Sequence, residues 1–281
     1  MIAVCSINKN LFTLAKGESM LRTVEKTWNE FWAYYWRVTC RHQIPGIYEW
    51  DRKLVDLIEK TCLLAPPMRI LDLGCGGGDQ SRIFAERGHS VVGIDIAESL
   101  VDHARKLFKE NHLSGRFIAD DMRNIDYTGE FDLCTALSGT FGFFSDEENS
   151  QQLKKIHGSL KPKGNAFIMY LSPFTKQKRT RIWTEIEDGY QLSEEWFDVK
   201  TSTYRSTIRL IMKDGTVLVP KAEPGYHANE VIRCYTAPEM EALLMHAGFA
   251  DIKFLSRKHI DNPDIVLEPW EEVDIVAATK A

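Results

Sequence analysis

The sequence predicts an α/β fold built on a mostly parallel sheet, and three observations carry this prediction. A short apolar run at residues 68–73 ends in a glycine-rich segment, 74–78, that leads into a helical pattern. Apolar runs and helical patterns then alternate up to residue 171. A β-rich segment at 173–230 interrupts the alternation before it resumes. Such alternation is typical of parallel strands joined by right-handed crossovers. We therefore expect a Rossmann-like, seven-stranded sheet with an N-terminal helical lid and an inserted antiparallel β-meander.

The helical lid is expected over residues 1–65. Trp28, Trp32 and Trp36 recur at a spacing of four and form one aromatic helix face, and a second helical pattern runs over 50–62. This aromatic face either covers bound ligands or packs against the edge of the sheet.

The first part of the core is expected over 66–172. Short apolar runs predict buried strands, and the periodic segments between them predict helices. In chain order these elements are strand 68–73, helix 80–87, strand 90–95, helix 98–110, strands 116–119 and 131–136, helix 146–160 and strand 165–171.

The inserted β-meander is expected over 173–230 as a cover for the acceptor site. Asp-Gly pairs at 188–189 and 214–215 are turn signals among β-type runs, of which the clearest are 196–199 and 207–211.

The second part of the core is expected over 231–281. A capping box from Thr236 to Glu239 begins a helix over 238–246, and strands follow at 250–255 and 273–279.

Composition and charge exclude several classes of protein. The chain has 281 residues, 44% hydrophobic and 27% charged, with a net charge of −5. This balance argues against disorder and against nucleic-acid binding through bulk charge. The sequence has no signal-peptide pattern and no apolar run of about 18 residues, so we expect no membrane partner. Its six cysteines form no C-x-x-C pair, which argues against zinc and favours a cytoplasmic protein.

The glycine-rich segment 74–78 predicts a ligand site between a strand and a helix. Glycines let a ligand approach the backbone, and the helix N-terminus attracts negative groups. A dinucleotide would favour glycine where Asp79 stands, and Asp72 adds a second charge beside a pyrophosphate. S-adenosylmethionine (AdoMet) fits better, because its amino group is a cation and its ribose hydroxyls suit Asp95. The alternative is a glycine turn without a ligand.

Several motifs together resemble those of class I AdoMet-dependent methyltransferases. The resemblance spans roughly 66–172 and 231–281. Its motifs are the glycine motif at 71–78, the second-strand acidic motif at 93–96, the "DMR" segment at 120–123, the "LKPGG" turn at 160–164, and the "YT-x-x-E…AGF" ending at 235–239 and 247–249.

The resemblance implies an enzyme that transfers the AdoMet methyl group to N or O of a small-molecule acceptor, leaving S-adenosylhomocysteine, without a metal. The transfer is an in-line SN2 displacement, so the protein mainly positions the reactants and excludes water. Residues 140–144 are similar to a segment of small-molecule methyltransferases, and glycine and aminosugar N-methyltransferases also carry inserted strands. Phe143 stands where the aminosugar enzymes have a histidine.

The resemblance also suggests cofactor contacts on the glycine loop, at the strand ends and in the lid. In this interpretation Asp121 faces the adenine amino group, Met122 covers the ring, Tyr34 closes over AdoMet and Arg41 pairs with its carboxylate. The full set of expected cofactor residues is Asp72, Gly74, Cys75, Gly76, Asp95, Ile96, Ser99, Asp121, Met122, Leu137, Tyr34 and Arg41.

Candidate acceptor residues lie mainly in the two additions to the core. The catalytic candidates are His227, whose unperturbed pKa lies near neutrality, and Tyr35. An exposed loop position is the alternative for His227, and a surface ion pair is the alternative for Arg233. The expected acceptor contacts are Trp36, Phe141, Phe143, Trp183 and Arg233.

The tryptophans favour a small acceptor. Six of the seven, all but Trp270, fall in residues 1–65 and 173–230, so we expect a largely closed acceptor site lined by aromatic rings. Three alternatives are an RNA or protein methyltransferase, a non-catalytic AdoMet-binding protein and an aminopropyl transferase. The base-methylation motif Asn-Pro-Pro-Tyr is absent at 136–139, which argues against nucleic acid. The sequence decides neither the acceptor nor between a monomer and a homodimer.

Overall fold

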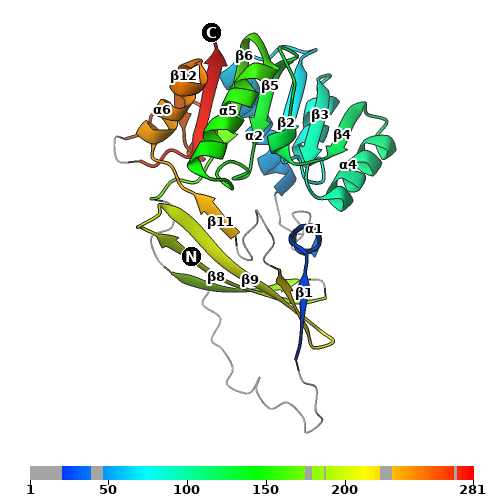
Figure 1. Cartoon of the computed structure of the whole chain (residues 1–281). Helices are drawn as coiled ribbons and strands as arrows, with labels where there is room; N and C mark the ends of the chain where they lie inside the picture. Colours follow the sequence, from blue (N-terminus) through cyan, green and yellow to red (C-terminus); the bar gives the residue numbers. More distant parts are fainter. Residues whose placement is uncertain (1–20, 39–46, 175–178, 187, 222–229, 269–270) are drawn as a thin grey trace.

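The computed structural model describes residues 21–38, 47–174, 179–186, 188–221, 230–268 and 271–281. Within these ranges the chain forms two sheets that lie one above the other in Figure 1. The side chains of Trp28, Trp36 and three neighbours in the same helix, and the segments that hold Arg41 and His227, lie outside the described residues.

The core is a seven-stranded sheet in the order β12-β13-β6-β5-β2-β3-β4. Strands β2 to β6 pair in parallel, and β13 runs antiparallel to both β6 and β12. The strands are β2 (Arg69–Leu73), β3 (Ser90–Asp95), β4 (Gly115–Ala119), β5 (Phe131–Ala136), β6 (Leu160–Met169), β12 (Phe249–Leu255) and β13 (Ile275–Lys280). The predicted Rossmann-like, mostly parallel sheet is confirmed.

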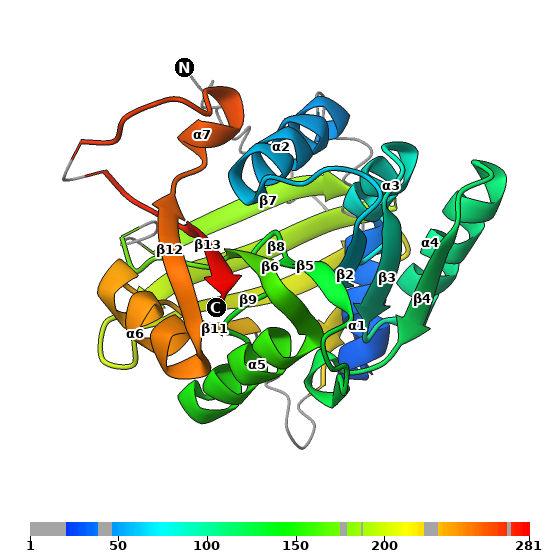
Figure 2. The same ribbon diagram turned by 90° about the horizontal axis from the view of Figure 1, so that it is seen from above.

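Helices cover both faces of this sheet, as Figure 2 shows from above. Buried apolar side chains of α2 and α3 pack on one face, and those of α5 and α6 pack on the other. No helix in these described ranges has the length and apolar character needed to cross a membrane. The helices are α2 (Ile47–Cys62), α3 (Asp79–Glu86), α4 (Glu98–Glu110), the 3-10 turn η2 (Met122–Asn124), α5 (Asp146–Ser159), α6 (Ala237–Ala247) and α7 (Lys258–Asp261).

Two details of the core follow from local sequence. The predicted capping box at Thr236 forms, with Thr236 and Glu239 each accepting from the other's backbone amide, and it begins α6. The segment 160–164, expected to be a turn, instead belongs to β6. A register shift against β5 and a positive φ at Lys163 (64°) let the strand pass through the sequence that suggested a turn.

The second sheet has the order β1-β10-β9-β8-β7, with β11 beside β9. Pairs β7–β8, β8–β9, β9–β10 and β9–β11 are antiparallel, which confirms the inserted meander, whereas β1 pairs with β10 in parallel. The strands are β1 (Arg22–Lys26), β7 (Thr180–Ile186), β8 (Gly189–Asp198), β9 (Thr203–Met212), β10 (Thr216–Pro220) and β11 (Glu230–Arg233).

Helix α1 (Trp28–Val38) lies between the two sheets in Figure 1. Its buried Phe31 and Trp32 pack against Ile186, Ile208 and Leu210 of the second sheet. Trp32 therefore packs against a sheet, which was one of the two alternatives for the aromatic face. That sheet is the inserted second sheet and not the edge of the core.

The described part of the expected helical lid contains the helices α1 and α2 and also one strand that the sequence did not predict. Residues 22–26 form β1, whose only apolar side chain is Val24. Its partner β10 lies almost two hundred residues away, so no local pattern announces the pairing. Helix α2 also differs from a lid, because Leu54, Leu57 and Ile58 are buried in the core on one face of the parallel sheet.

Candidate active site

The carboxyl ends of the parallel strands face the second sheet (Figure 1). Strand β6 leads from this edge into β7, and β11 leads back toward α6. In parallel sheets covered by helices, ligands bind at the carboxyl ends of the strands. The candidate site is therefore the edge of the core that α1 and the second sheet cover.

The glycine loop, residues 74–78, joins β2 to α3 at this edge. The amides of Gly74 and Cys75 both donate to the Ile94 carbonyl, at 2.8 and 3.1 Å, which holds the loop against the end of β3. The Cys75 thiol is buried beside Phe117 of β4, and burial raises its pKa. Cys75 is therefore a packing residue whose backbone shapes the loop.

Two glycines of the loop have different reasons to lack a side chain. A Cβ on Gly74 would lie 2.4 Å from Cγ2 of Thr140, so this glycine permits close packing on the loop after β5. Gly76 has φ +52°, and a Cβ there would meet no atom within 4 Å. Gly76 thus borders free space at the helix N-terminus, where a ligand can approach the backbone.

Asp95 ends β3 beside Gly76. Its Oδ2 accepts the Gly76 amide at 2.9 Å, and its Oδ1 accepts the Ala97 amide at 2.9 Å. Burial raises the pKa of this carboxyl, although both amides favour the ionised form. Each carboxylate oxygen can accept a further hydrogen bond. Asp95 therefore fits the two hydroxyls of a ribose lying over the loop.

Asp72 is fully buried under the loop. Its Oδ2 accepts from the Ser81 hydroxyl at 2.6 Å and its Oδ1 from the Thr135 hydroxyl at 2.8 Å. Burial raises the Asp72 pKa to about 6, and the two hydroxyls oppose that rise. A cation at the loop would stabilise the ionised carboxylate, so Asp72 suits a ligand with an ammonium group.

Asp121 begins η2 and already has a strong partner. It accepts the Arg123 amide at 2.9 Å and Nη2 of the Arg123 guanidinium at 2.6 Å. Arg123 also pairs with Glu148 at 2.8 Å and lies 4.4 Å from the centre of the Phe144 ring. An adenine amino group would share Asp121 with Arg123. This ion pair was not expected from the "DMR" resemblance.

The other expected cofactor residues on the core differ in exposure. Met122 is partly buried against the core, Ile96 is partly exposed and Ser99 is exposed at the start of α4. Leu137 is buried, and its carbonyl accepts the Thr140 hydroxyl at 2.6 Å. Leu137 and Thr140 thus tie the end of β5 to the glycine loop.

Three of the expected acceptor contacts lie elsewhere than expected. Phe141 is only 3% exposed and packs on Tyr235 inside the core, with 5.8 Å between ring centres. Trp183 is 63% exposed, because it pairs with Leu192 on the outer face of the second sheet. Side chains alternate between the two faces of a strand, so Trp183 points away from α1. These placements correct the expectation for Phe141 and Trp183.

The third expected acceptor contact that lies elsewhere is Arg233. Its guanidinium pairs with Asp146 at 3.0 Å and Glu239 at 2.9 Å, and it lies 4.5 Å from the centre of the Tyr235 ring. Two carboxylates thus already balance the charge of the Arg233 guanidinium, as in the alternative of a surface ion pair. Phe143, by contrast, is partly buried against Tyr204 of the second sheet, at the junction between the two sheets.

The described tyrosines of α1 point to the second sheet. The Tyr34 hydroxyl lies 3.8 Å from the Met212 sulfur, and the Tyr35 hydroxyl accepts from Nε2 of Gln191 at 3.4 Å. Burial raises the Tyr35 pKa to about 12, and Glu230 and Glu195 add to the rise. Tyr35 therefore stays protonated at neutral pH, and its neutral phenol is able to donate a hydrogen bond.

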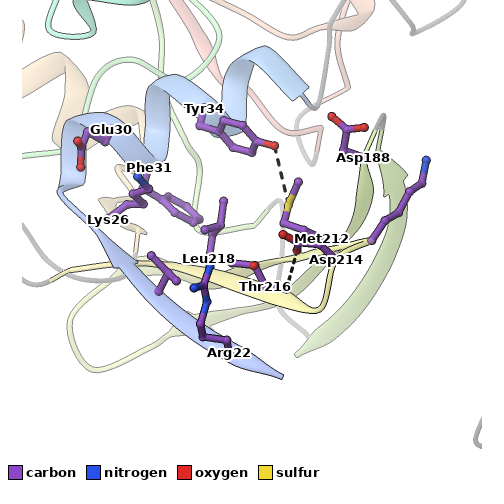
Figure 3. Close-up of a pocket in the computed structure, with 12 residues that line it drawn as sticks. Arg22, Lys26, Glu30, Phe31, Tyr34, Asp188, Met212, Asp214, Thr216 and Leu218 are labelled. Carbon is purple, nitrogen blue, oxygen red and sulfur yellow. Dashed lines mark hydrogen bonds between the residues drawn. The ribbon is translucent and has the colours of Figure 1, made fainter. Parts of the chain in front are cut away.

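A cavity of about 610 Å³ opens between α1 and the strands β1, β9 and β10 (Figure 3). Its walls combine apolar and charged side chains, and no residue of the glycine loop is among them. Among the expected site residues that the structure describes, only Tyr34 lines it. Its lining is Arg22, Val24, Lys26, Glu30, Phe31, Tyr34, Asp188, Met212, Lys213, Asp214, Thr216 and Leu218.

A polar group on the second sheet was missed by the sequence reasoning. We name it the inner-face cluster, and it consists of Ser193, Glu195, Tyr204, Ser206 and Glu230. The Glu230 carboxylate accepts the Ser206 hydroxyl at 2.9 Å. The alternation of polar residues along β8 was a usable signal, but a polar alternation usually indicates a solvent-facing side.

Comparisons with known proteins find relatives among the methyltransferases. The methyltransferase domain family matches residues 70–164, from β2 into β6. YqeM of Bacillus subtilis, which carries a provisional methyltransferase name, is 32% identical over 185 residues, covering 64% of this chain and 73% of that protein. The cypemycin N-terminal methyltransferase of a Streptomyces species is 32% identical over 110 residues, covering 39% of this chain and 44% of that protein.

Solved structures of low sequence identity share the fold. An S-adenosylmethionine-dependent methyltransferase from Clostridium acetobutylicum has a TM-score of 0.64 at 15% identity, covering 90% of this chain and 97% of that one. CalS10 is an amino pentose methyltransferase from Micromonospora echinaspora that was solved with its methyl donor bound. It has a TM-score of 0.61 at 19% identity, covering 92% of this chain and 100% of that one. The fold, the glycine loop with Asp95 and the sequence match together show that the chain belongs to the AdoMet-dependent methyltransferases.

Proposed function

We propose that this enzyme methylates N or O of a small-molecule acceptor held between the parallel sheet and the second sheet. The supporting observation is the cover: α1 and the second sheet lie over the edge that carries Gly76 and Asp95 (Figure 1). A covered site favours a small acceptor over a folded macromolecule, because a macromolecular surface cannot enter it.

In this proposal, residues at the carboxyl ends of β2, β3 and β4 would hold the cofactor. Gly76 allows close approach, Asp95 accepts the ribose hydroxyls and Asp72 faces the ammonium group. Asp121 and Met122 contact the adenine, with Asp121 shared with Arg123. Bound AdoMet supplies a methyl group on a positively charged sulfur, which keeps the bonding electrons when an acceptor lone pair forms the new bond.

The chain's own contribution is then orientation and exclusion of water. Phe31 and Trp32 fix α1 on the second sheet, and Tyr35 presents a neutral phenol donor toward the acceptor. His227 and Trp36 keep their proposed roles as acceptor base and acceptor contact, and Arg41 keeps its role toward the cofactor carboxylate. We further propose that residues 173–230 act as the acceptor-site cover together with the N-terminal segment.

Calorimetry with AdoMet tests the cofactor side. The wild type should bind, and Asp95→Ala should bind at least about tenfold more weakly because two charge-assisted hydrogen bonds are lost. Asp102→Ala is the matched control, since Asp102 lies on the exposed side of α4 and pairs with Arg105. Failure of the wild type to bind, or equal binding by Asp95→Ala, would refute the proposed site.

Label transfer tests the acceptor side. The enzyme is incubated with radiolabelled AdoMet and a cell extract, and the extract is then divided into small metabolites, RNA and protein. We expect the label among the metabolites. Label confined to RNA or protein would contradict the small-acceptor proposal.

A further inference from the structure

The η2 turn follows β4 and begins beside the proposed ribose site. The Asp120 amide donates to the Asp95 carbonyl at 3.0 Å, and Asp121 is the next residue along the chain. Asp121 is the N-cap of the turn, and its carboxylate accepts the Arg123 amide at 2.9 Å. A nucleoside whose ribose is held by Asp95 would carry its base toward this turn.

The Arg123 side chain engages both oxygens of the Asp121 carboxylate. Its Nη2 donates to Oδ2 at 2.6 Å, and its Nε lies 3.1 Å from Oδ1 and 3.0 Å from Oδ2. A guanidinium that contacts both oxygens fixes the plane of a carboxylate, whereas the ammonium group of a lysine acts as a point charge. Arg123 therefore determines the orientation of the Asp121 carboxylate.

The Arg123 guanidinium is itself held by the start of α5. Its Nη1 donates to Glu148 at 2.8 Å, and its central carbon lies 4.4 Å from the centre of the Phe144 ring. The hydrogen bonds from Ser145 in the capping box, together with the charge of Arg123, lower the pKa of Glu148, so Glu148 is ionised at neutral pH. A fixed carboxylate and an aromatic ring thus restrain the guanidinium from turning away from Asp121.

One face of α5 also holds the backbone of the turn. Glu148, Gln152 and Lys155 recur at spacings of four and three, so they lie on the same face of the helix. Nε2 of Gln152 donates to the Met122 carbonyl at 3.1 Å, and the Lys155 ammonium donates to the Arg123 carbonyl. With the ion pair between Glu148 and Arg123, this face contacts both the backbone and the guanidinium. The turn is therefore positioned by α5 as well as by its own strand.

We propose that Arg123 is a positioning residue that makes the cofactor site selective for adenine over a base with a carbonyl group in place of the amino group. The ionised Asp121 carboxylate accepts hydrogen bonds and donates none, so it attracts an amino group and repels a carbonyl oxygen. This preference is strong only where the carboxylate cannot turn, and Arg123 supplies that restraint. The inference rests on the proposed function for the placement of the adenine at Asp121.

S-adenosylhomocysteine and S-inosylhomocysteine test the selectivity. In the second ligand a carbonyl oxygen replaces the amino group of the base, and the neighbouring ring nitrogen carries a proton. Calorimetry on the full-length wild type should show at least about tenfold tighter binding of S-adenosylhomocysteine.

Two variants loosen the Asp121 carboxylate. Arg123→Lys should bind S-adenosylhomocysteine about tenfold more weakly. It should bind S-inosylhomocysteine at least as well as the wild type, because a carboxylate that can turn is able to accept the ring N–H. Most of the preference is then lost. Glu148→Gln keeps the capping box and should lose part of the preference, about threefold.

A double-mutant cycle tests whether Arg123 acts through Asp121. Asp121→Asn should lose the preference, because an amide can present either its oxygen or its amino group to the base. Adding Arg123→Lys to Asp121→Asn should then change the preference no further.

Arg233→Lys is the matched control. Arg233 of β11 also bridges two carboxylates, Asp146 and Glu239, and lies 4.5 Å from the centre of the Tyr235 ring. Its substitution should therefore affect stability in a similar way and leave the preference between the two ligands unchanged. Thermal unfolding of each variant checks that the fold is kept.

The outcomes separate this inference from the proposed function. A purely structural role would weaken both ligands equally in Arg123→Lys, and that result would overturn the inference. Tighter binding of S-adenosylhomocysteine by Arg123→Lys would also overturn it, because Arg123 would then compete with the base. A wild type that binds S-adenosylhomocysteine without preference overturns the inference and leaves the proposed function standing. A wild type that binds neither ligand overturns both.

Discussion

Asp72→Asn should stabilise the protein at neutral and higher pH and weaken its binding of AdoMet. The Asp72 carboxyl is buried at 2% exposure, and its pKa rises from 3.8 to about 6. The folded state therefore holds more protons than the unfolded state between about pH 4 and pH 6. The Asp72 contribution to the free energy of unfolding falls as the pH rises through this window.

The magnitude follows from the shift of about two pKa units. Each unit corresponds to about 1.4 kcal/mol, so the ionised Asp72 lowers the free energy of unfolding by about 3 kcal/mol at pH 8 and by less than about 1 kcal/mol at pH 4. Asparagine removes the ionisation and can still bond to Ser81 and Thr135. The difference between variant and wild type should therefore grow with pH.

Urea unfolding without AdoMet at a series of pH values from 4 to 8 measures this difference. Thr135→Val is the companion variant: it removes one hydrogen bond to the carboxylate and should destabilise the protein more at pH 8 than at pH 4. A pH-independent difference between Asp72→Asn and wild type, or a loss of stability in Asp72→Asn at pH 8, would refute the reasoning.

Four further outcomes are expected. AdoMet affinity, measured by calorimetry, should fall as the pH drops below about 6, by up to about tenfold per pH unit, because Asp72 must lose a proton to meet the ammonium group. Gly76→Ala should melt slightly lower, because its φ of +52° strains an L residue, and should bind AdoMet at least about tenfold more weakly. Gly74→Ala should melt lower still, because its methyl group also overlaps Thr140. In the labelled-methyl assay, Tyr35→Phe should leave the pH–rate profile from pH 7 to 10 unchanged in shape, since the Tyr35 pKa is about 12. Phe31→Ala should cost about 3–5 kcal/mol in urea unfolding, because Phe31 is fully buried against the second sheet.

Local patterns were sufficient for the parallel core. Strands β2, β3 and β5 are each a short apolar run followed by a helical period, and the glycine loop marks the first crossover, so the order of these elements could be read along the chain. Strand β1 could not be predicted in this way. Its five residues carry one apolar side chain, and their pairing is decided by β10 at the far end of the inserted segment.

The parts of the candidate site that depend on the backbone could be predicted from the sequence. The predictions that depended on the direction of a side chain were wrong. The loop, Asp72 and Asp95 are fixed by a strand–turn–helix unit within thirty residues. Trp183 was misplaced because a one-residue step on a strand exchanges the two faces. The same step places Ser193 and Glu195 on the covered side, which only the register of β8 with β9 reveals.

The parallel pairing of β1 with β10 has a consequence for the evolution and engineering of this chain. The N-terminal segment and the segment after β6 are remote in sequence, yet they build one sheet. A recombination that exchanges residues 173–230 alone would leave β1 facing a foreign edge strand and α1 facing a foreign surface. In the proposed function these two segments cover the acceptor site, so acceptor specificity would be inherited as a two-piece module, and a chimera should graft both pieces together onto the parallel core.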